Sequence, residues 1–216
     1  MRSKISFTAV LFFLFCLKIS FASDGKPASF LPSKEDIVTE INLARKNPEK
    51  YALFLEKFKK NFDGKKFKRK GKKTIETKEG MTAVNEAIKY LKKVEPCQPL
   101  TLSKGMSEGA RDHILNISKT STTGHKGTDG SLPGQRIDRY GKWEDALGEN
   151  ICYGFNTARE IVIWMIIDDS VADRGHRINI FRQHFNFVGI HCASHPLYNI
   201  ICVITFAGNY TEGRSP

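Results

Sequence analysis

The spacing of apolar residues changes along the chain, from a helical period over most of its length to alternation near the C-terminus. Apolar side chains recur at steps of three and four in four stretches, and each stretch predicts an amphipathic or buried helix. These helices are expected at residues 34–46, 81–94, 104–117 and 158–169, with a further turn or two after Pro48. A Ser or Thr that can cap a helix N-terminus precedes the first, third and fourth of them: Ser33, Ser103 and Thr157.

Two strands are predicted near the C-terminus, where apolar and polar residues alternate. They cover residues 187–192 and 199–206 and flank a turn at residues 194–198. Residues 119–148 are rich in Gly, Ser, Thr and Asp, which is typical of a loop. Helices on both sides of a small antiparallel sheet would form an α/β/α three-layer sandwich, so the predicted fold class is α+β.

The N-terminal segment is predicted to be a signal peptide. A short basic start precedes an apolar run over residues 5–17, and small residues suited to cleavage follow at residues 20–22. Cleavage after Ala22 would release a secreted or periplasmic chain, whereas a lipoprotein site at Cys16 is the alternative, disfavoured by the bulky residue before it. The remaining chain would comprise a lead at residues 23–32, one domain at residues 33–210 and a tail at residues 211–216.

Composition narrows the class of protein. The chain has 216 residues, of which 40% are hydrophobic and 26% charged, and this content excludes a disordered chain and a multi-span membrane protein. The formal net charge of +11 comes mostly from residues 57–73, which hold ten basic side chains and one acid. Because this run has no apolar period, we expect an exposed, mobile basic loop at about residues 57–78.

The basic run has three interpretations. It can be a solvated loop, or it can contact an anionic membrane surface or another polyanion. Phe58, Phe62 and Phe67 are interleaved with the lysines, which fits a membrane contact. Nucleic acid is disfavoured, because an exported protein rarely meets it and no recognition fold is visible. A membrane contact would use Lys57, Lys59, Lys60, Lys65, Lys66 and Lys68.

Short polar segments beside glycines carry the candidate chemistry. The standard signatures of zinc proteases, serine hydrolases and phosphate-binding loops are absent. A glycine next to an imidazole or a carboxylate instead lets a ligand approach the backbone closely. Such segments lie at residues 124–125, 148–150, 168–169 and 174–177. Two imidazoles and two carboxylates from these segments could converge in one cleft.

Together these segments resemble the CAP superfamily of cysteine-rich secretory proteins, antigen 5 and pathogenesis-related 1 proteins, also called SCP-like domains, and more narrowly its microbial branch. Gly-Glu-Asn-Ile-Cys-Tyr at residues 148–153 and Asp-Asp-Ser-Val-Ala-Asp-Arg-Gly-His-Arg at residues 168–177 are similar to two family motifs. Residues 42–51 resemble the opening helix of the microbial branch, and residues 202–207 resemble the closing strand of the family. The resemblance runs from about residue 37 to residue 206 and implies the CAP fold.

The resemblance also implies a central cavity, lined by two histidines and two acidic residues, that can take a divalent metal such as zinc. His125 and His176 match the two histidines, and Glu149 matches the first acid. Asp168 falls where the family has a Glu, with Asp169 as the alternative, and either Asp is one methylene shorter than a Glu. With two imidazoles as its metal ligands, the site would be weak and exchangeable.

Two classes of function are compatible with such a cavity. Family members are mostly associated with binding, including sterols and other lipids, so the resemblance favours a binding or interaction module, with a monomer as the preferred state. The alternative is a metal-dependent hydrolase in which Glu149 or Asp168 acts as the general base on metal-bound water. Asn150 and Arg177 would belong to the cavity or its support in either case.

Four cysteines follow the predicted cleavage site, and an exported protein can oxidise them. Cys192 and Cys202 are equally far from Leu197, the middle of the predicted turn, so an antiparallel hairpin would place them opposite each other. Cys97 and Cys152 would then form the second pair. The alternative is that all four are free, buried thiols.

Overall fold

A computed structural model describes residues 31–69, 71, 73–120 and 122–213. The expected signal peptide, nearly all of the expected lead and the last three residues lie outside this part. The helices are α1 Lys34–Lys46, α2 Pro48–Lys59, α3 Met81–Leu91, α4 Lys104–Ile117, α5 Pro133–Ile137, α6 Ala158–Ile167 and α7 Gly175–Phe181. The strands are β1 Phe62–Asp63, β2 Lys66–Phe67, β3 Ile75–Glu76, β4 Thr101–Leu102, β5 Gly141–Tyr153, β6 Phe187–His195 and β7 Asn199–Glu212.

The predicted N-caps are confirmed at three helices. The Ser33 hydroxyl accepts a hydrogen bond from the backbone N–H of the third residue after it, at 3.0 Å. Ser103 and Thr157 do the same at 3.1 and 3.2 Å. Each bond satisfies one of the N–H groups that a helix start leaves without an intrahelical partner. The sequence therefore determines where α1, α4 and α6 begin.

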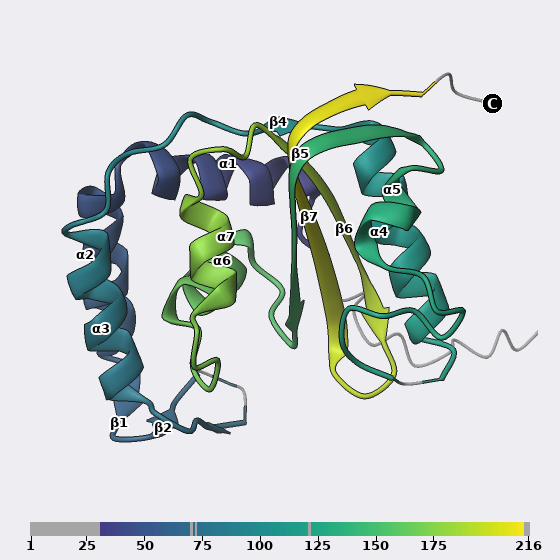
Figure 1. The fold of residues 1–216 in the computed structure, drawn as a ribbon. Coiled ribbons are helices and arrows are strands. Elements are labelled where there is room, and N and C mark those ends of the chain that lie inside the picture. The colour runs from purple at the N-terminus through teal and green to yellow at the C-terminus, as the bar shows by residue number, and fades with distance from the viewer. Residues whose placement is uncertain (1–30, 70, 72, 121, 214–216) are drawn as a thin grey trace, which may run out of the picture.

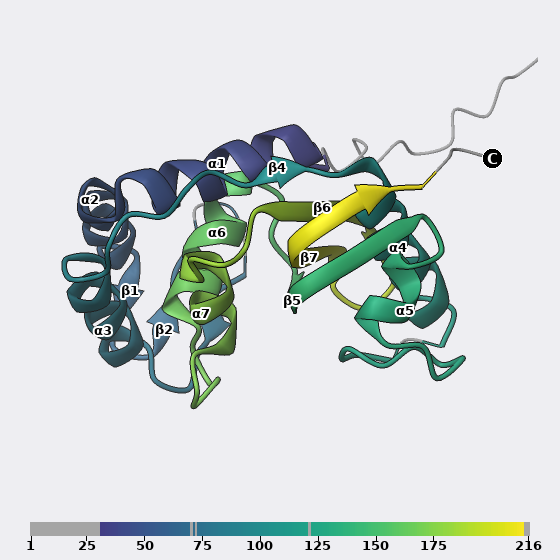
Figure 2. The same ribbon diagram turned by 45° about the horizontal axis from the view of Figure 1, so that its top comes forward.

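The central sheet has the strand order β4–β6–β7–β5, so β5 is an edge strand. The two long pairs, β6 with β7 and β7 with β5, are antiparallel, while the short β4 runs parallel to β6. Helices α4 and α5 pack on one face of this sheet, and α1, α6 and α7 pack on the other (Figures 1 and 2). This arrangement confirms the predicted α/β/α sandwich. Among the described residues, no helix is long and apolar enough to span a membrane.

The stretch predicted as a loop at residues 119–148 is only partly irregular, so that prediction is wrong in its second half. Helix α5 lies there, and β5 begins at Gly141. The first half of β5 is mostly exposed, and its pairing with β7 is interrupted between Glu144 and Leu147. An exposed, irregular strand has no continuous alternation of apolar and polar residues, which is why the sequence did not predict it.

The basic run predicted as an exposed, mobile loop is exposed over most of its described residues, but it contains short strands and is anchored to the domain; residues 60–78 are called the insert below. Helix α2 continues to Lys59, and β1, β2 and β3 form a small antiparallel sheet beyond it. Lys70 and Lys72 lie outside the described residues. The sequence did not predict the strands and the anchoring, because the few apolar residues of the insert make contacts distant in sequence.

An aromatic cluster anchors this insert to α6. The rings of Phe58, Phe62 and Phe67 lie 5.9, 6.0 and 5.1 Å from the ring of Trp164, measured between centroids. Phe67 is 1% exposed. The phenylalanines that were expected to support a membrane contact therefore face the domain: Phe67 is buried, and Phe58 and Phe62 are partly buried against the core.

The disulfide between Cys192 and Cys202 is present, as predicted, and joins directly opposed residues of β6 and β7 with 4.1 Å between their Cα atoms. The predicted bridge between Cys97 and Cys152 is wrong, because both residues are free and buried. The Cys97 thiol lies 3.2 Å from the carbonyl oxygen of Phe181, the last residue of α7, whereas Cys152 lies opposite Cys202 in the β5–β7 ladder. The two thiols thus belong to different parts of the core.

Candidate binding site at the sheet edge

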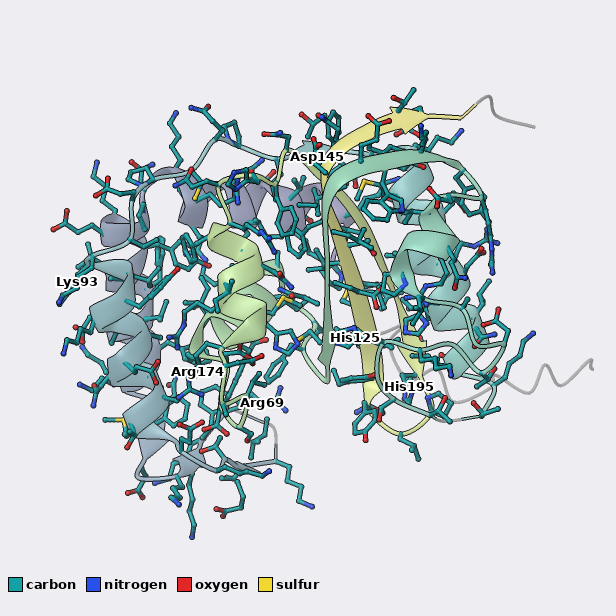
Figure 3. The ribbon with its side chains drawn as sticks, viewed as in Figure 1. Arg69, Lys93, His125, Asp145, Arg174 and His195 are labelled. Atoms are coloured by element: carbon teal, nitrogen blue, oxygen red, sulfur yellow. A yellow bond between two sulfur atoms is a disulfide. The ribbon has the colours of Figure 1, made fainter. Side chains whose placement is uncertain are left out.

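The first predicted pair of site residues meets beside β5. Nδ1 of His125 lies 3.0 Å from Oε1 of Glu149. His125 lies on the loop that follows α4. His113 of α4 fixes this loop, because Nε2 of His113 lies 2.8 Å from the carbonyl oxygen of Gly124. The His125 side chain is 51% exposed, whereas that of Glu149 is 2% exposed. A half-exposed imidazole is therefore oriented by a buried carboxylate of β5; Figure 3 labels His125 near the lower end of this strand.

The buried Glu149 carboxylate is held by Arg136, which sequence reasoning missed. Nη2 of Arg136 donates to both carboxylate oxygens, at 3.0 and 2.8 Å, and the Thr205 hydroxyl lies 3.4 Å from Oε2. Nη1 of Arg136 donates to the carbonyl oxygen of His125 at 3.2 Å. The arginine lies in α5, inside the stretch expected to be a loop, so only its position in a short Pro-Gly-Gln-Arg segment could have drawn attention to it.

The second predicted pair meets on the other side of β5. Nδ1 of His176 lies 2.7 Å from Oδ1 of Asp168, and Oδ2 accepts the backbone N–H groups of His176 and Arg177 at 2.9 and 3.3 Å. Asp168 ends α6 in the left-handed conformation, with φ of 55°. This turn brings its carboxylate to the N-terminus of α7, where α7 presents His176.

The alternative acid, Asp169, points away from the histidine. Its carboxylate accepts the backbone N–H groups of Lys78, Glu79 and Gly80 at 2.8 to 2.9 Å. Burial alone would raise the pKa of Asp169, but these three donors hold it below its ordinary value. Asp169 thus ties the insert to the end of α6, and Asp168 is the acid in contact with His176.

Two further predicted residues support the second pair. The amide of Asn150 donates to the carbonyl oxygen of His176 at 3.0 Å. The buried guanidinium of Arg177 donates to the carbonyl oxygens of Ile166 and Ile167, and it does not line the cavity described below. Asn150 and Arg177 therefore fix the backbone around the site rather than offering groups to a ligand.

Glu79, just before α3, and Glu86 of α3 hold the loop between α6 and α7 in place through Arg174. The Arg174 guanidinium donates to both carboxylates, with its shortest distance to each at 2.6 Å, and to the carbonyl oxygen of Asp168 at 2.8 Å. Hydrogen bonding to Arg174 lowers the pKa of Glu79 to about 2. Figure 3 shows Arg174 below α6, with Arg69 of the insert nearby. These ion pairs fix the loop between α6 and α7, and the sequence motifs did not predict them.

The two histidine–carboxylate pairs lie on opposite faces of the edge strand. Side chains alternate along β5, so Glu149 and Ile151 face α4 while Asn150 and Cys152 face α6 and α7. Among the described residues, no group of three or more His, Cys, Asp and Glu side chains could hold a metal ion. The structure thus forms each pair as expected from the motifs, and β5 lies between the two pairs.

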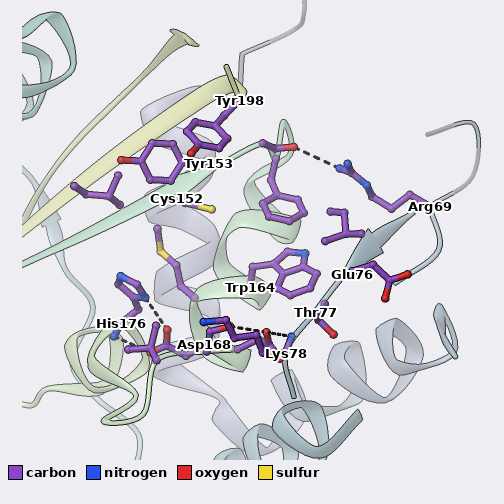
Figure 4. Close-up of a pocket in the computed structure, with 18 residues that line it drawn as sticks. Arg69, Glu76, Thr77, Lys78, Cys152, Tyr153, Trp164, Asp168, His176 and Tyr198 are labelled. Carbon is purple, nitrogen blue, oxygen red and sulfur yellow. Dashed lines mark hydrogen bonds and ion pairs between the residues drawn. The ribbon is translucent and has the colours of Figure 1, made fainter. Parts of the chain in front are cut away.

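A cavity of about 550 Å³ opens beside the second pair. Its walls come from the insert, the end of β5, α6 and the start of α7 (Figure 4). His176 and Asp168 line it, whereas His125 and Glu149 do not. Much of the remaining wall is apolar or aromatic, formed by Ile75, Ile151, Tyr153, Phe155, Trp164, Met165, Val171 and Tyr198. This composition is typical of sites for small apolar ligands.

One side of the cavity carries polar donors without partners. The Arg69 guanidinium carbon lies 5.3 Å from the centre of the Phe155 ring, which stacks on Trp164 at 5.1 Å. Nε of Arg69 and Nε1 of Trp164 are buried and have no hydrogen-bond partner among the described residues. A buried donor without a partner is costly, so both groups favour a ligand or a water that brings an acceptor. No sequence motif pointed to either residue.

Comparison with known proteins gives the family. Residues 81–206 match CAP, the cysteine-rich secretory protein family. Because this match covers more than half of the 216 residues, the chain belongs to the CAP family, as the motifs indicated. A search among curated proteins found no significant match.

Similar solved structures include three bacterial proteins. An outer surface protein from Borrelia burgdorferi is 17% identical, with a TM-score of 0.43, over 51% of this chain and 78% of its own. An extracellular protein containing an SCP domain from Bacillus anthracis is 15% identical, with a TM-score of 0.41, over 59% of this chain and 38% of its own. A cysteine-rich secretory protein from Staphylococcus aureus is 14% identical, with a TM-score of 0.38, over 60% of this chain and 38% of its own. The match thus spans less than half the length of the last two proteins.

Proposed function

We propose that the chain is an exported binding module whose cavity beside β5 takes a lipid-like ligand with a polar or acidic head. The observation that carries this proposal is the mostly apolar and aromatic wall of the cavity, whose one histidine–carboxylate pair is held by hydrogen bonds within the protein. Export rests on the N-terminal sequence and on membership of a secretory family.

The state of the two carboxylates favours binding over the hydrolase alternative. Glu149 accepts hydrogen bonds from Arg136 at both oxygens, from His125 and from Thr205, which occupies the four lone pairs of a carboxylate. Asp168 is engaged by a ring nitrogen and two backbone N–H groups. A general base needs a lone pair directed at the water or substrate, so both acids are better suited to orienting the imidazoles.

The thiol among the described residues that line the cavity is not an activated nucleophile. Cys152 is this thiol, and burial raises its pKa to about 12. A thiol with such a pKa is protonated at neutral pH and is a poor nucleophile. This supports reversible binding in the cavity.

Arg69 is the group we expect to meet the ligand's head. It is the arginine among the lining residues, it lies over Phe155, and its Nε has no partner among the described residues. An acidic head at Arg69 would place the apolar body of the ligand along Phe155 and Trp164.

The ligand proposal is tested with cis-parinaric acid, a fluorescent fatty acid. We expect saturable binding that a chelator does not affect, and we expect Arg69→Gln to weaken it about tenfold, since a hydrogen bond to a charged group contributes about 1.5 kcal/mol. Lys68→Gln is the matched control, because Lys68 belongs to the same insert but pairs with Asp63 outside the cavity. Equal weakening by both substitutions, or no binding by the wild type, would show that the cavity is not the ligand site.

We further propose that His125 and His176, which lie on the two faces of the edge strand β5, bind one divalent ion, such as Zn²⁺, weakly beyond the free edge of that strand. With Nδ1 of each ring donating to a carboxylate, Nε2 of each neutral imidazole keeps its lone pair and can serve as a metal ligand. Two protein ligands leave the other coordination positions to water, so the ion would exchange readily. Such an ion would supply a Lewis acid at the edge of β5.

Calorimetry with Zn²⁺ tests this site. Binding should be lost in His125→Ala and in His176→Ala and retained in His184→Ala, where an exposed histidine outside the site is removed. Equal affinities in the wild type and in the two site variants would disprove the assignment.

The basic insert supports a second, weaker proposal of contact with an anionic membrane. Lys66 and Lys68 pair with Glu76 and Asp63, while Lys57, Lys59, Lys60 and Lys65 add positive charge nearby. Because the phenylalanines face inward, this contact would be electrostatic alone and would disappear at high salt. Sedimentation with phosphatidylserine vesicles at low and high salt tests it, and binding that is independent of salt would contradict it.

A further inference from the structure

A buried histidine organises the turn between β6 and β7. His195 is the last residue of β6 and is 3% exposed, although the turn residues that follow it are exposed. Its Nδ1 accepts the backbone N–H groups of Leu197 and Tyr198, at 3.2 and 3.3 Å. Because Pro196 has no N–H group, these are the two backbone donors of the turn residues. The shape of the turn therefore depends on the lone pair at Nδ1 of His195.

The same turn supplies part of the cavity wall. Tyr198 lines the cavity, and its ring lies 4.8 Å from that of Tyr153 of β5, which lines the cavity as well. Figure 4 shows the two tyrosine rings side by side in this wall. The imidazole of His195 contacts both rings, with centroid distances of 5.1 Å to Tyr198 and 5.8 Å to Tyr153. His195 thus fixes both the backbone and the ring of Tyr198.

The imidazole has to be neutral to hold the turn. A lone pair at Nδ1 places the ring proton on Nε2, which is buried and has no hydrogen-bond partner among the described residues. The ionisable side chains whose rings face it are Tyr153 of β5 and Tyr198 of the turn, and neither carries a charge at neutral pH. Helix α4 packs along β6, but none of its described side chains bonds to the imidazole. An imidazolium here would therefore be buried without a counter-charge.

We infer that His195 is a positioning residue: it holds Tyr198 in the cavity wall while its imidazole is neutral and releases it when the imidazole is protonated. Protonation puts a hydrogen on Nδ1, which removes the acceptor of both turn N–H groups and directs a third donor at them. The turn then opens, and the charged ring gains contact with water. The consequence for binding rests on the proposed function: a ligand held against Tyr198 at neutral pH binds more weakly in acid.

NMR spectroscopy of the wild-type chain at pH 8 and pH 5 tests the turn without any ligand. At pH 8 we expect a nuclear Overhauser effect between the rings of Tyr153 and Tyr198. We also expect the Leu197 and Tyr198 amides to exchange with solvent more slowly than those of an unstructured peptide at the same pH. At pH 5 the ring contact should be lost, and this protection should fall about tenfold or more. An unchanged ring contact and unchanged protection at the two pH values would overturn the inference.

Two substitutions separate the acceptor from the charge. His195→Asn places an amide oxygen near the position of Nδ1 and cannot take up a proton, so the turn should stay closed at both pH values. His195→Gln carries its amide further from the backbone, near the position of Nε2, so the turn should be open at both. His184→Asn, which removes an exposed histidine, is the matched control and should respond like the wild type. A response in His195→Asn equal to that of the wild type would show that another group controls the turn.

The affinity for cis-parinaric acid connects the turn to the cavity. Between pH 8 and pH 5 the wild type should lose about fivefold more affinity than His195→Asn, because Tyr198 is one of several rings in the wall. Comparing the two chains at each pH removes the titration of the fatty acid and of His176, which are common to both. Equal losses would overturn the pH control of binding. A wild type that binds no fatty acid at either pH would remove the proposed function, while the NMR measurements still decide the role of His195.

Discussion

At the scale of single residues, a buried pair of charged side chains positions the first half of the site. Arg136 and Glu149 are 1% and 2% exposed in their side chains and are joined at 2.8 Å. The pair orients His125, and both oxygens of the Glu149 carboxylate accept hydrogen bonds from Arg136. The motif predicted Glu149 and His125, but it could not predict Arg136, because its only sequence context is a short segment that resembles a loop.

Removing Arg136 should therefore be costly. Arg136→Met leaves the Glu149 carboxylate buried without its main partner, and we expect the free energy of unfolding to fall by about 3–5 kcal/mol. Arg139→Met is the matched control, because Arg139 forms exposed pairs with Asp112 and Asp129 and should contribute less than about 1 kcal/mol. Urea denaturation measures both, and similar losses in the two variants would contradict the role given to Arg136.

The free thiols give a second prediction for single residues. Burial raises the pKa of Cys152 to about 12 and raises that of Cys97 as well, so neither should react with iodoacetamide in the native protein. Unfolding in urea without a reductant should expose two reactive thiols, while Cys192 and Cys202 stay linked. Peptide mapping by mass spectrometry checks this. Four alkylated cysteines, or a peptide linking Cys97 to Cys152, would contradict the structure.

Helices and strands could be predicted from the sequence where the residues that determine them lie within a few positions of one another. The starts of α1, α4 and α6 follow from caps and from apolar residues within a few positions. Strand β5 depends on pairing with β7 some 60 residues later, and the insert depends on Trp164, so neither has a complete local signal. In the insert, lysines outnumber the apolar residues that hold it in place.

The insert should accordingly behave as part of the folded domain. Phe67→Ala removes a buried ring from the cluster around Trp164 and should lower the free energy of unfolding by about 3–4 kcal/mol. Lys66→Ala, at the neighbouring exposed position, should change it by less than about 0.5 kcal/mol. The measurement is urea denaturation of both variants. A loss of less than 1 kcal/mol for Phe67→Ala would restore the interpretation of a loosely attached loop.

The molecule as a whole gathers its site residues from separate regions of the chain. His125 and Glu149 are 24 residues apart, and Asp168 and His176 are eight apart, yet each pair is in contact. Motif order could predict these residues because their types and spacing resemble a family pattern. It could not predict Arg69, which reaches the cavity from the insert, or the ion pair of Glu79 with Arg174, which joins residues 95 positions apart.

Acid should destabilise the whole fold through Glu79, which fastens α3 to the loop that carries His176. Hydrogen bonding to Arg174 lowers its pKa from the ordinary 4.5 to about 2, so between these pH values the unfolded chain binds more protons than the folded one. The stabilising effect is therefore complete above pH 4.5 and is lost as the pH falls towards 2. Glu79→Gln should lower stability at pH 7 and converge with the wild type near pH 2. Urea denaturation across this range measures the free energy of unfolding of each variant, with Glu95→Gln, at an exposed position, as the control. A difference between wild type and Glu79→Gln that stays constant from pH 7 to pH 2 would show that Glu79 does not carry this effect.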